Sequence, residues 1–356
     1  MEKDTEIILS FEDKEKLIKA LVTDFQLNKA WEIRKELHNL KDIEVKPIGL
    51  KVIDFIKYED KRGEFKHPLL DYLTYILKYI KILCNKNMLT SIPSTGLPWL
   101  EEQYTSIMMP LDEEYWKRIT SYADILGIDY LYYKLSKYEA HIEVVNERKE
   151  VHSGSGTLIA PGVILTCRHV VEPEKFQISR IEINGQIYET KKLVVSEKKD
   201  IALVYIKGCQ LEPVNDIIFG EAKVLEDIIT FGYPAIPMLR EAPLITQKGE
   251  INAVTRDFYN RKCLIISSIV RPGNSGGAII SKDGLYVGMV SDFKERHSLE
   301  DKIKVDKTLT AQAQIESMVA QINTLPQLVP FYSGIATEEI VDEIKKLDPE
   351  LRFTTV

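Results

Sequence analysis

The amino-acid sequence predicts a multidomain α+β protein with an N-terminal helical bundle, a region of short β-strands and short C-terminal helices. Its 356 residues correspond to two or three domains of ordinary size. Apolar residues recur at helical spacing over residues 1–83, and from residue 141 onward they form short β-branched runs between turn residues. Helical spacing returns at residues 307–324 and 337–346.

Residues 1–83 predict four or five short amphipathic helices. Ser10 followed by Asp13 resembles a capping box, and an apolar stripe follows it. A later helix ends near Gly63, and the next one starts at Pro68, where the missing backbone donor of proline is tolerated. Short helices of this kind predict a compact bundle.

The segment that follows the bundle has a mixed pattern. Ser, Gly and Pro cluster in residues 88–100 and predict a linker or long loop, whereas residues 112–126 and 129–140 predict helices. We therefore divide the chain into a helical domain, a connector, a β-rich domain and a tail with a short helix, at residues 1–83, 84–140, 141–325 and 326–356.

The β-rich domain shows about a dozen short runs without interleaved helices, which predicts a barrel or a sandwich. The predicted strands are residues 141–146, 155–160, 163–166, 178–184, 187–196, 201–206, 227–231, 244–254, 263–270, 277–281 and 285–291.

Composition excludes several classes of function. The net charge is −7 and acidic residues are spread along the whole chain, which argues against nucleic-acid binding. The longest apolar runs are too short for a membrane span, and the acidic N-terminus does not resemble a secretory signal. The four scattered cysteines then predict reduced thiols in a cytoplasmic protein. The six histidines are too dispersed to predict a metal site, and we expect no cofactor.

Three segments of the β-rich domain place a histidine, an acid and a serine in positions suited to catalysis. His169 follows Leu-Thr-Cys-Arg at the end of a strand, and Asp200 opens the strand Ile-Ala-Leu-Val. Ser275 lies between glycines in Pro-Gly-Asn-Ser-Gly-Gly. A serine hydroxyl becomes a nucleophile when an imidazole takes its proton, and a buried carboxylate fixes the imidazole tautomer. Neighbouring glycines let backbone N–H groups face a developing oxyanion.

These segments, in the order His, Asp, Ser and with the sequence GNSGG, resemble the trypsin-like serine peptidases, and most of all their bacterial HtrA-type branch. The resemblance covers residues 141–325 and implies a chymotrypsin-like antiparallel double β-barrel, with two six-stranded barrels and a cleft between them. It also implies that His169, Asp200 and Ser275 form a catalytic triad in this cleft.

The same resemblance implies roles for further residues. The backbone N–H groups of Gly273 and Ser275 correspond to the oxyanion hole, and Ser291 corresponds to the serine that supports the catalytic aspartate. Two positions depart from the family pattern. Bulky Arg168 precedes the histidine, and we expect its side chain to point to water or to the cleft rim. Uncharged Asn274 precedes the serine. We therefore expect activation without an ion pair at Asn274.

The same resemblance implies a specificity pocket at Ile269, Val290 and Asp292, with Ile269 at the position where trypsins have an acid. An apolar residue at position 269 cannot pair with a cation, so we expect cleavage after small or medium apolar residues. Asp292 beside the expected pocket wall leaves a preference for basic residues open.

Each catalytic assignment has a structural alternative. His169 could be a buried structural histidine, Asp200 a hydrogen-bonding residue at the start of a strand, and Ser275 part of an unreactive tight turn. Asp216 and Asp227 compete for the role of the acid, but neither opens a strand of the Ile-Ala-Leu-Val type.

Residues 1–83 resemble the small death-fold-like effector-associated domains that recruit trypsin-like peptidases in bacterial conflict systems, although an unrelated helical domain gives the same apolar pattern. The sequence therefore predicts an intracellular serine endopeptidase that acts on proteins through an acyl-enzyme. Its expected partners are a protein substrate and a regulatory protein bound to residues 1–83, with antiviral defence as the biological setting. The alternative is an inactive, protease-like scaffold that acts by binding other proteins.

Overall fold

The structure is a computed structural model that describes residues 8–40, 49–93, 102–106, 111–236, 239, 241–291 and 332–356. The chain divides into two compact units, Met1–Tyr130 and Leu131–Val356. The helix predicted for residues 307–324 and the pocket residue Asp292 lie outside the described residues. No helix in the described ranges is both long enough and apolar enough to cross a membrane.

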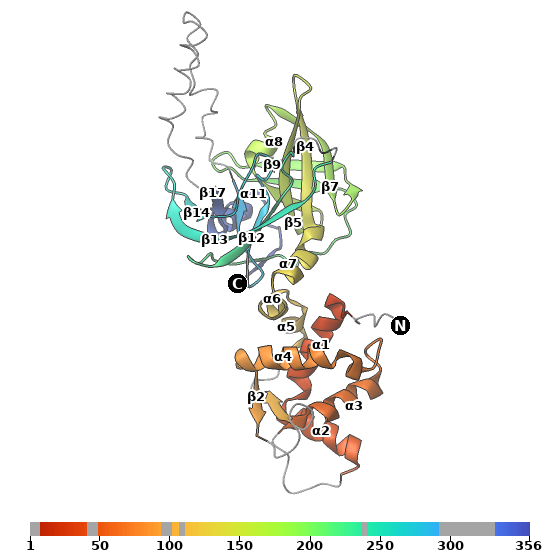
Figure 1. Ribbon diagram of the computed structural model, residues 1–356. Coiled ribbons are helices and arrows are strands. Elements are labelled where there is room, and N and C mark those ends of the chain that lie inside the picture. The colour runs from red at the N-terminus through yellow and green to blue at the C-terminus, as the bar shows by residue number, and fades with distance from the viewer. Residues whose placement is uncertain are drawn as a thin grey trace, which may run out of the picture. The chain divides into compact units, whose positions relative to one another are not determined.

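The first unit is mainly helical, as its apolar periodicity predicts (Figure 1). Ser10 caps the first helix, because its hydroxyl accepts the Asp13 N–H at 3.1 Å. Gly63 ends the third helix in the left-handed conformation with φ of 68°, which glycine adopts without steric cost. The four main helices are α1 (Phe11–Asp24), α2 (Leu27–His38), α3 (Val52–Arg62) and α4 (Leu73–Asn85).

A small antiparallel sheet belongs to the same unit. Strand β3 (Gln103–Ser106) pairs with β1 (Leu50–Lys51) on one side and with β2 (Leu89–Ile92) on the other. Strand β2 lies where the sequence predicts a loop, because strand formation here depends on tertiary pairing rather than on local propensity. Three short helices follow in the chain: α5 (Glu113–Lys117), α6 (Thr120–Leu126) and α7 (Ile128–Leu135).

The second unit begins with a seven-stranded antiparallel sheet, in the order β8-β7-β4-β5-β6-β10-β9. This sheet is a half-barrel rather than the six-stranded barrel that the family resemblance implies. All of residues 139–206 are described, and within them the edge strands β8 and β9 do not pair with each other. The strands are β4 (Glu139–Asn146), β5 (Val151–Ala160), β6 (Val163–Thr166), β7 (Phe176–Ile183), β8 (Gln186–Ile187), β9 (Thr190–Val195) and β10 (Ala202–Ile206).

Six further strands close into a barrel, because β15 pairs with both β12 and β16. Its interior is packed with apolar side chains, among them Ile228, Ile251, Leu264, Ile279 and Val287. The strands are β12 (Asp227–Gly232), β13 (Ile245–Arg256), β14 (Lys262–Ile266), β15 (Ala278–Ser281), β16 (Leu285–Val290) and β17 (Tyr332–Ala336).

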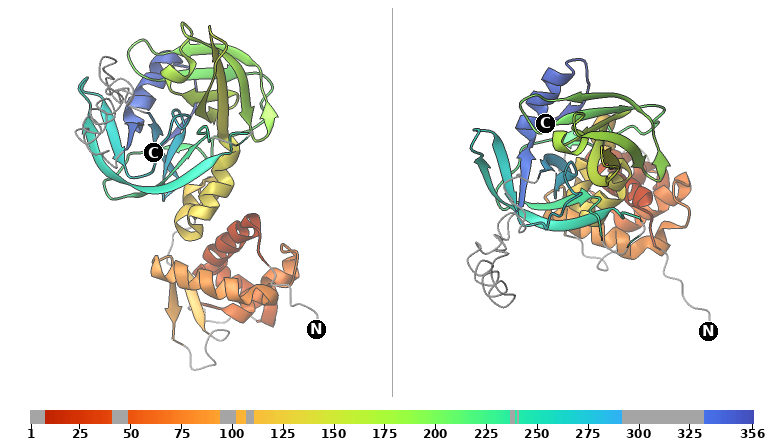
Figure 2. Two further views of the ribbon diagram at one scale, coloured as in Figure 1. Left: turned by 45° about the horizontal axis from the view of Figure 1, so that its top comes forward. Right: turned by 90° about the horizontal axis from the view of Figure 1, so that it is seen from above.

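The last helix, α11 (Thr337–Leu347), confirms the helix expected at residues 337–346 and follows β17 directly. It packs against β16 and β17 and is the dark blue helix of the second unit in both views of Figure 2. Two short strands, β11 (Ile218–Phe219) and β18 (Thr354–Thr355), pair in parallel and extend the second sheet beyond β16.

Candidate active site

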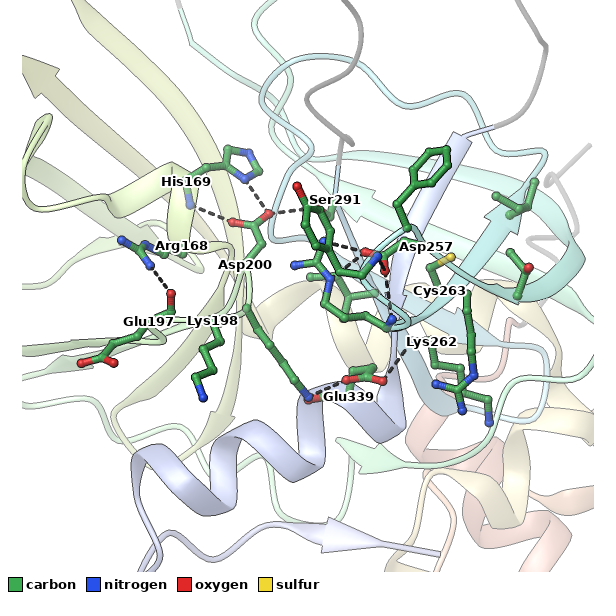
Figure 3. A pocket seen from close by; sticks show the side chains of 18 of the residues that line it. Arg168, His169, Glu197, Lys198, Asp200, Asp257, Lys262, Cys263, Ser291 and Glu339 are labelled. Carbon is green, nitrogen blue, oxygen red and sulfur yellow. Dashed lines mark hydrogen bonds and ion pairs between the residues drawn. The ribbon is translucent and has the colours of Figure 1, made fainter.

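His169 and Asp200 lie side by side because two neighbouring strands place them there. His169 belongs to the short helix α8 (Arg168–Val171), which directly follows β6, and Asp200 directly precedes β10. Strands β6 and β10 are antiparallel, with Thr166 opposite Ala202, so the end of one meets the start of the other. Asp200 accepts the His169 backbone N–H at 2.9 Å and lies 2.7 Å from the imidazole Nδ1 (Figure 3).

Ser291, at the end of a strand of the six-stranded barrel, completes the hydrogen bonding of this carboxylate. It directly follows β16, and its hydroxyl donates to Asp200 Oδ2 at 2.9 Å (Figure 3). Burial opposes ionisation of Asp200, but the hydrogen bonds and charge of His169 and the Ser291 hydroxyl outweigh it and lower the pKa of the carboxyl to about 2. Asp200 is therefore ionised at neutral pH and can only accept protons, so Nδ1 of His169 is the donor.

Ser275 is buried in the loop between β14 and β15, and backbone contacts fix it at the seam between the two sheets. Its carbonyl accepts the Ser155 N–H at 2.9 Å, and the next N–H, of Gly276, donates to Val290 O at 2.8 Å. A Cβ on Gly276 would lie 2.4 Å from Thr166 Oγ1. Thr166 precedes the His169 helix and Val290 precedes Ser291, so these contacts place Ser275 near the His–Asp pair.

Within the described residues, the Ser275 hydroxyl forms no hydrogen bond to the His169 imidazole. The structure thus joins His169, Asp200 and Ser291 by hydrogen bonds and brings Ser275 to the same seam through its backbone. Hydrogen bonds between a nucleophile and its base are often long without substrate and shorten when substrate binds.

The loop before Ser275 contains a tight turn. The Asn274 N–H donates to Arg271 O at 2.9 Å, and Gly273 has φ of 101°. Proline followed by a glycine with positive φ is typical of a type II turn. Among the described residues, neither the Gly273 N–H nor the Ser275 N–H has an acceptor in the protein, so both can donate to a bound oxyanion.

Ser155 holds this turn in place and was not assigned a role from the sequence. Its fully buried hydroxyl donates to Gly273 O at 2.7 Å and accepts the Tyr233 N–H at 2.8 Å. The Gly154-Ser155-Gly156 segment is visible in the sequence, but its function depends on contact with a loop more than a hundred residues away, which no local pattern reveals.

Cys167 lies beneath the site, where the sequence predicts only a reduced thiol. Its buried thiol donates to Val290 O at 3.3 Å, and its sulfur lies within 4.8 Å of the ligand atoms of His169 and Asp200. Burial raises the pKa of the Cys167 thiol well above its usual value. A metal ion would need the thiolate and would have to separate His169 from Asp200, so the donor set fits the hydrogen-bonded pair better than a metal.

A cavity of about 700 Å³ opens beside His169, Asp200 and Ser291 (Figure 3). Its wall includes the apolar residues Cys263, Ile265 and Ile335. The rest of its lining comes mainly from the β13–β14 connection, the loop before Asp200, helix α8 and helix α11, and many of these residues are charged.

Two residues of the predicted specificity pocket, Ile269 and Val290, do not line this cavity. The Ile269 side chain is 48% exposed, Val290 is buried, and Asp292 lies outside the described part of the chain. Arg168 does line the cavity instead of pointing to water, because its guanidinium donates to the carbonyls of Ser196 and Glu197 at 2.8 and 3.0 Å.

Part of the chain is similar to known serine proteases. Residues 154–289 match the model of the trypsin-like peptidase domain. The probable periplasmic serine endoprotease DegP-like of Chlamydia pneumoniae is 29% identical over 40% of this chain and 29% of its own length. Serine protease HTRA1 of Xenopus laevis is 30% identical over 44% of this chain and 34% of its own length. The chain thus spans about a third of the length of these curated relatives.

Solved structures include the active form of the Rv3671c protease from M. tuberculosis, with a TM-score of 0.44 and 16% identity. That match covers 61% of this chain and 84% of the other. The family model and the curated relatives confirm the resemblance noted in the sequence, whereas they do not cover the death-fold likeness of residues 1–83. Residues 154–289 are therefore a trypsin-like peptidase domain, homologous to the HtrA/DegP-type serine proteases.

Proposed function

We propose that the chain is a serine endopeptidase that cleaves proteins through an acyl-enzyme. The observation that supports this most directly is the 2.7 Å contact between Asp200 and Nδ1 of His169, with Ser275 held at the same seam. Because Nδ1 carries its proton toward Asp200, Nε2 is left as the basic nitrogen. An imidazole in this tautomer is suited to take the proton of a serine hydroxyl.

In the proposed reaction, Ser275 Oγ attacks the scissile carbonyl carbon while its proton passes to Nε2 of His169. The carbonyl oxygen becomes an oxyanion and accepts hydrogen bonds from the N–H groups of Gly273 and Ser275. His169 then protonates the leaving amine, the C–N bond breaks, and an acyl ester remains on Ser275. Water, deprotonated by His169, hydrolyses this ester and restores the free hydroxyl.

We propose an apolar preference for the side chain that enters the cavity beside His169. Cys263, Ile265 and Ile335 form an apolar part of its wall that cannot pair with a charged substrate side chain, and burying an unpaired charge is costly. Charged residues also line the cavity, but several of them already pair within the protein, as Lys199 does with Glu339 and Arg261 with Asp257. Sequencing the products of a peptide library tests this, and dominant cleavage after Lys or Arg would contradict it.

We also propose that residues 1–83 bind a regulatory protein, and that the peptidase acts in the cytoplasm as part of a defence system. The four free cysteines and the helical first unit are consistent with this proposal. Affinity capture with residues 1–83, combined with the activity of a 138–356 fragment, tests the regulatory role. Failure to recover a partner together with unchanged activity of the fragment would count against it.

A fluorophosphonate probe tests the catalytic proposal, because it reacts with an activated serine. We expect labelling of the wild type, loss of labelling in Ser275→Ala, and a fall of about 10⁴-fold in peptide hydrolysis. Ser179→Ala is the control, because this exposed serine lies on β7 away from the site. Labelling that is absent in the wild type, or that persists in Ser275→Ala, would favour the inactive scaffold.

A further inference from the structure

The loop that carries Asp200 is anchored from outside the first sheet. It connects β9 to β10, and Ser196 closes it, because its N–H donates to Ile201 O at 2.9 Å. The Ser196 hydroxyl also accepts the N–H groups of Lys198 and Lys199 at 3.2 and 2.9 Å. The loop is therefore compact, but these contacts are internal and do not set its position relative to the second barrel.

Helix α11 supplies the outside contacts. The Ser196 hydroxyl donates to Glu343 Oε1 at 2.6 Å, and both residues are buried. The Lys199 ammonium lies 2.5 Å from Glu339 Oε2 and donates to the Glu339 carbonyl at 3.1 Å. Glu339 and Glu343 are one helical turn apart on the same face of α11, so they hold the loop at both Ser196 and Lys199.

Glu339 also reaches the wall of the cavity. Its Oε1 accepts the backbone N–H of Lys262, the first residue of β14, at 2.9 Å. The Glu339 carboxylate thus connects the loop next to Asp200 with the start of β14 in the six-stranded barrel. Figure 3 shows Glu339 below the hydrogen-bonded pair of His169 and Asp200. The side chains of Lys199 and Glu339 are only 15% and 17% exposed, and removing the Glu339 charge leaves the largely buried Lys199 with only the longer contact of 3.8 Å to Glu343.

We propose that Lys199, Glu339 and Glu343 are positioning residues, through which helix α11 sets the place of Asp200 relative to His169 and Ser291. Asp200 directly follows Lys199 and belongs to the first sheet, whereas Ser291 and α11 belong to the second barrel. The hydrogen bond between Ser291 and Asp200 spans the same seam as the contacts of α11. A shift of this loop changes the geometry of the hydrogen bonds between His169 and Asp200, although it removes no group that touches substrate.

This inference rests on the proposed function for its kinetic readout, and it has a second readout that does not. Glu339→Gln removes the charge at constant size, and we expect kcat to fall about 10-fold with KM unchanged. The proton between His169 Nδ1 and Asp200 lies in a 2.7 Å contact, so we expect it to give a downfield ¹H NMR signal in the wild type. We expect that signal to shift or broaden in the variant.

The matched control is Glu338→Gln. Glu338 is the neighbouring residue on α11 and pairs with the Lys262 side chain, but it makes no contact with the Asp200 loop among the described residues. It should therefore leave kcat and the NMR signal as in the wild type. Lys199→Arg keeps the charge and should retain most of the activity, which shows that the ion pair rather than general stability is responsible.

The outcomes separate this inference from the proposed function. Wild-type kinetics and an unchanged downfield signal in Glu339→Gln would overturn the inference while leaving the peptidase intact. Equal losses in Glu338→Gln and Glu339→Gln would overturn it too, because they would indicate a general effect on α11. A wild type without peptidase activity would refute the proposed function, and the NMR comparison would still decide whether α11 positions Asp200.

Discussion

The Asp200 carboxylate accepts two hydrogen bonds from His169, one from the backbone N–H at 2.9 Å and one from the imidazole Nδ1 at 2.7 Å. The two bonds use different carboxylate oxygens, so they fix both the position of the helix α8 and the rotation of the ring. Ser291 shares Oδ2 with the imidazole. This arrangement makes Asp200 the residue on which the tautomer of His169 depends.

Asp200→Asn should therefore abolish most of the proposed activity without unfolding the chain. An amide at this position can present an N–H to Nδ1, which moves the imidazole proton to the wrong nitrogen, and we expect kcat to fall about 10⁴-fold. Steady-state kinetics on a peptide substrate measures this. Asp216→Asn is the control, because this buried carboxylate bonds Tyr138 and lies on a different loop. Loss of activity in Asp216→Asn but not in Asp200→Asn would show that Asp216, and not Asp200, orients His169.

Asp200 should also contribute to stability in a pH-dependent way. The pKa of its carboxyl in the folded protein is about 2, below the ordinary value of about 3.9 in an unfolded chain. The carboxylate therefore stabilises the fold fully above about pH 4, by about 2 kcal/mol, and this contribution disappears as the pH falls toward about 2. Urea unfolding across this range should show a steeper loss of stability in the wild type than in Asp200→Asn. Parallel curves for the two proteins would contradict this prediction.

Glu139 should have the opposite effect. This buried residue of β4 accepts the Thr157 hydroxyl, and burial raises the pKa of its carboxyl to about 8. Because this exceeds the ordinary value of about 4.3, its contribution to stability is full below about pH 4 and is lost as the pH rises through about 8.

Glu139→Gln should remove this pH dependence, since an amide oxygen can still accept the Thr157 hydroxyl and carries no charge. The variant should be more stable than the wild type at about pH 8 and similar to it at about pH 4. Thermal unfolding at several pH values tests this, with Glu143→Gln, a less buried residue of the same strand, as the control. A variant less stable than the wild type at about pH 8 would show that Glu139 is ionised and paired there.

Gly276→Ala should disrupt the seam. Gly276 has φ of 90°, and an added Cβ would lie 2.0 Å from Ser155 O, a backbone atom that cannot move aside. We expect a loss of about 3 kcal/mol or more in the free energy of unfolding. Gly185 has φ of 74° but open space around it, so Gly185→Ala reports the backbone strain alone and should cost about 1 kcal/mol. Equal costs in the two variants would show that the contact at the seam is unimportant.

Local sequence patterns predict much of the fold. The capping box at Ser10, the glycine that ends α3 and the alternation of short β-branched runs predict helices and strands that the structure contains. Strands β2 and β17 were not predicted, because their formation depends on pairing with β3 and with β14. Propensity describes a residue's own backbone, whereas a strand also depends on what lies beside it.

For the site, the sequence by itself determined the chemical types and their order: a histidine after a strand, an acid before one, and a serine between glycines. Only the tertiary structure decided that Ser155 holds the Gly273 turn, that Cys167 lies under the His–Asp pair, and that Glu339 anchors the Asp200 loop. The reason is physical: a hydrogen bond depends on distances of about 3 Å between atoms, and residues far apart in sequence acquire those distances only when the sheets pack together.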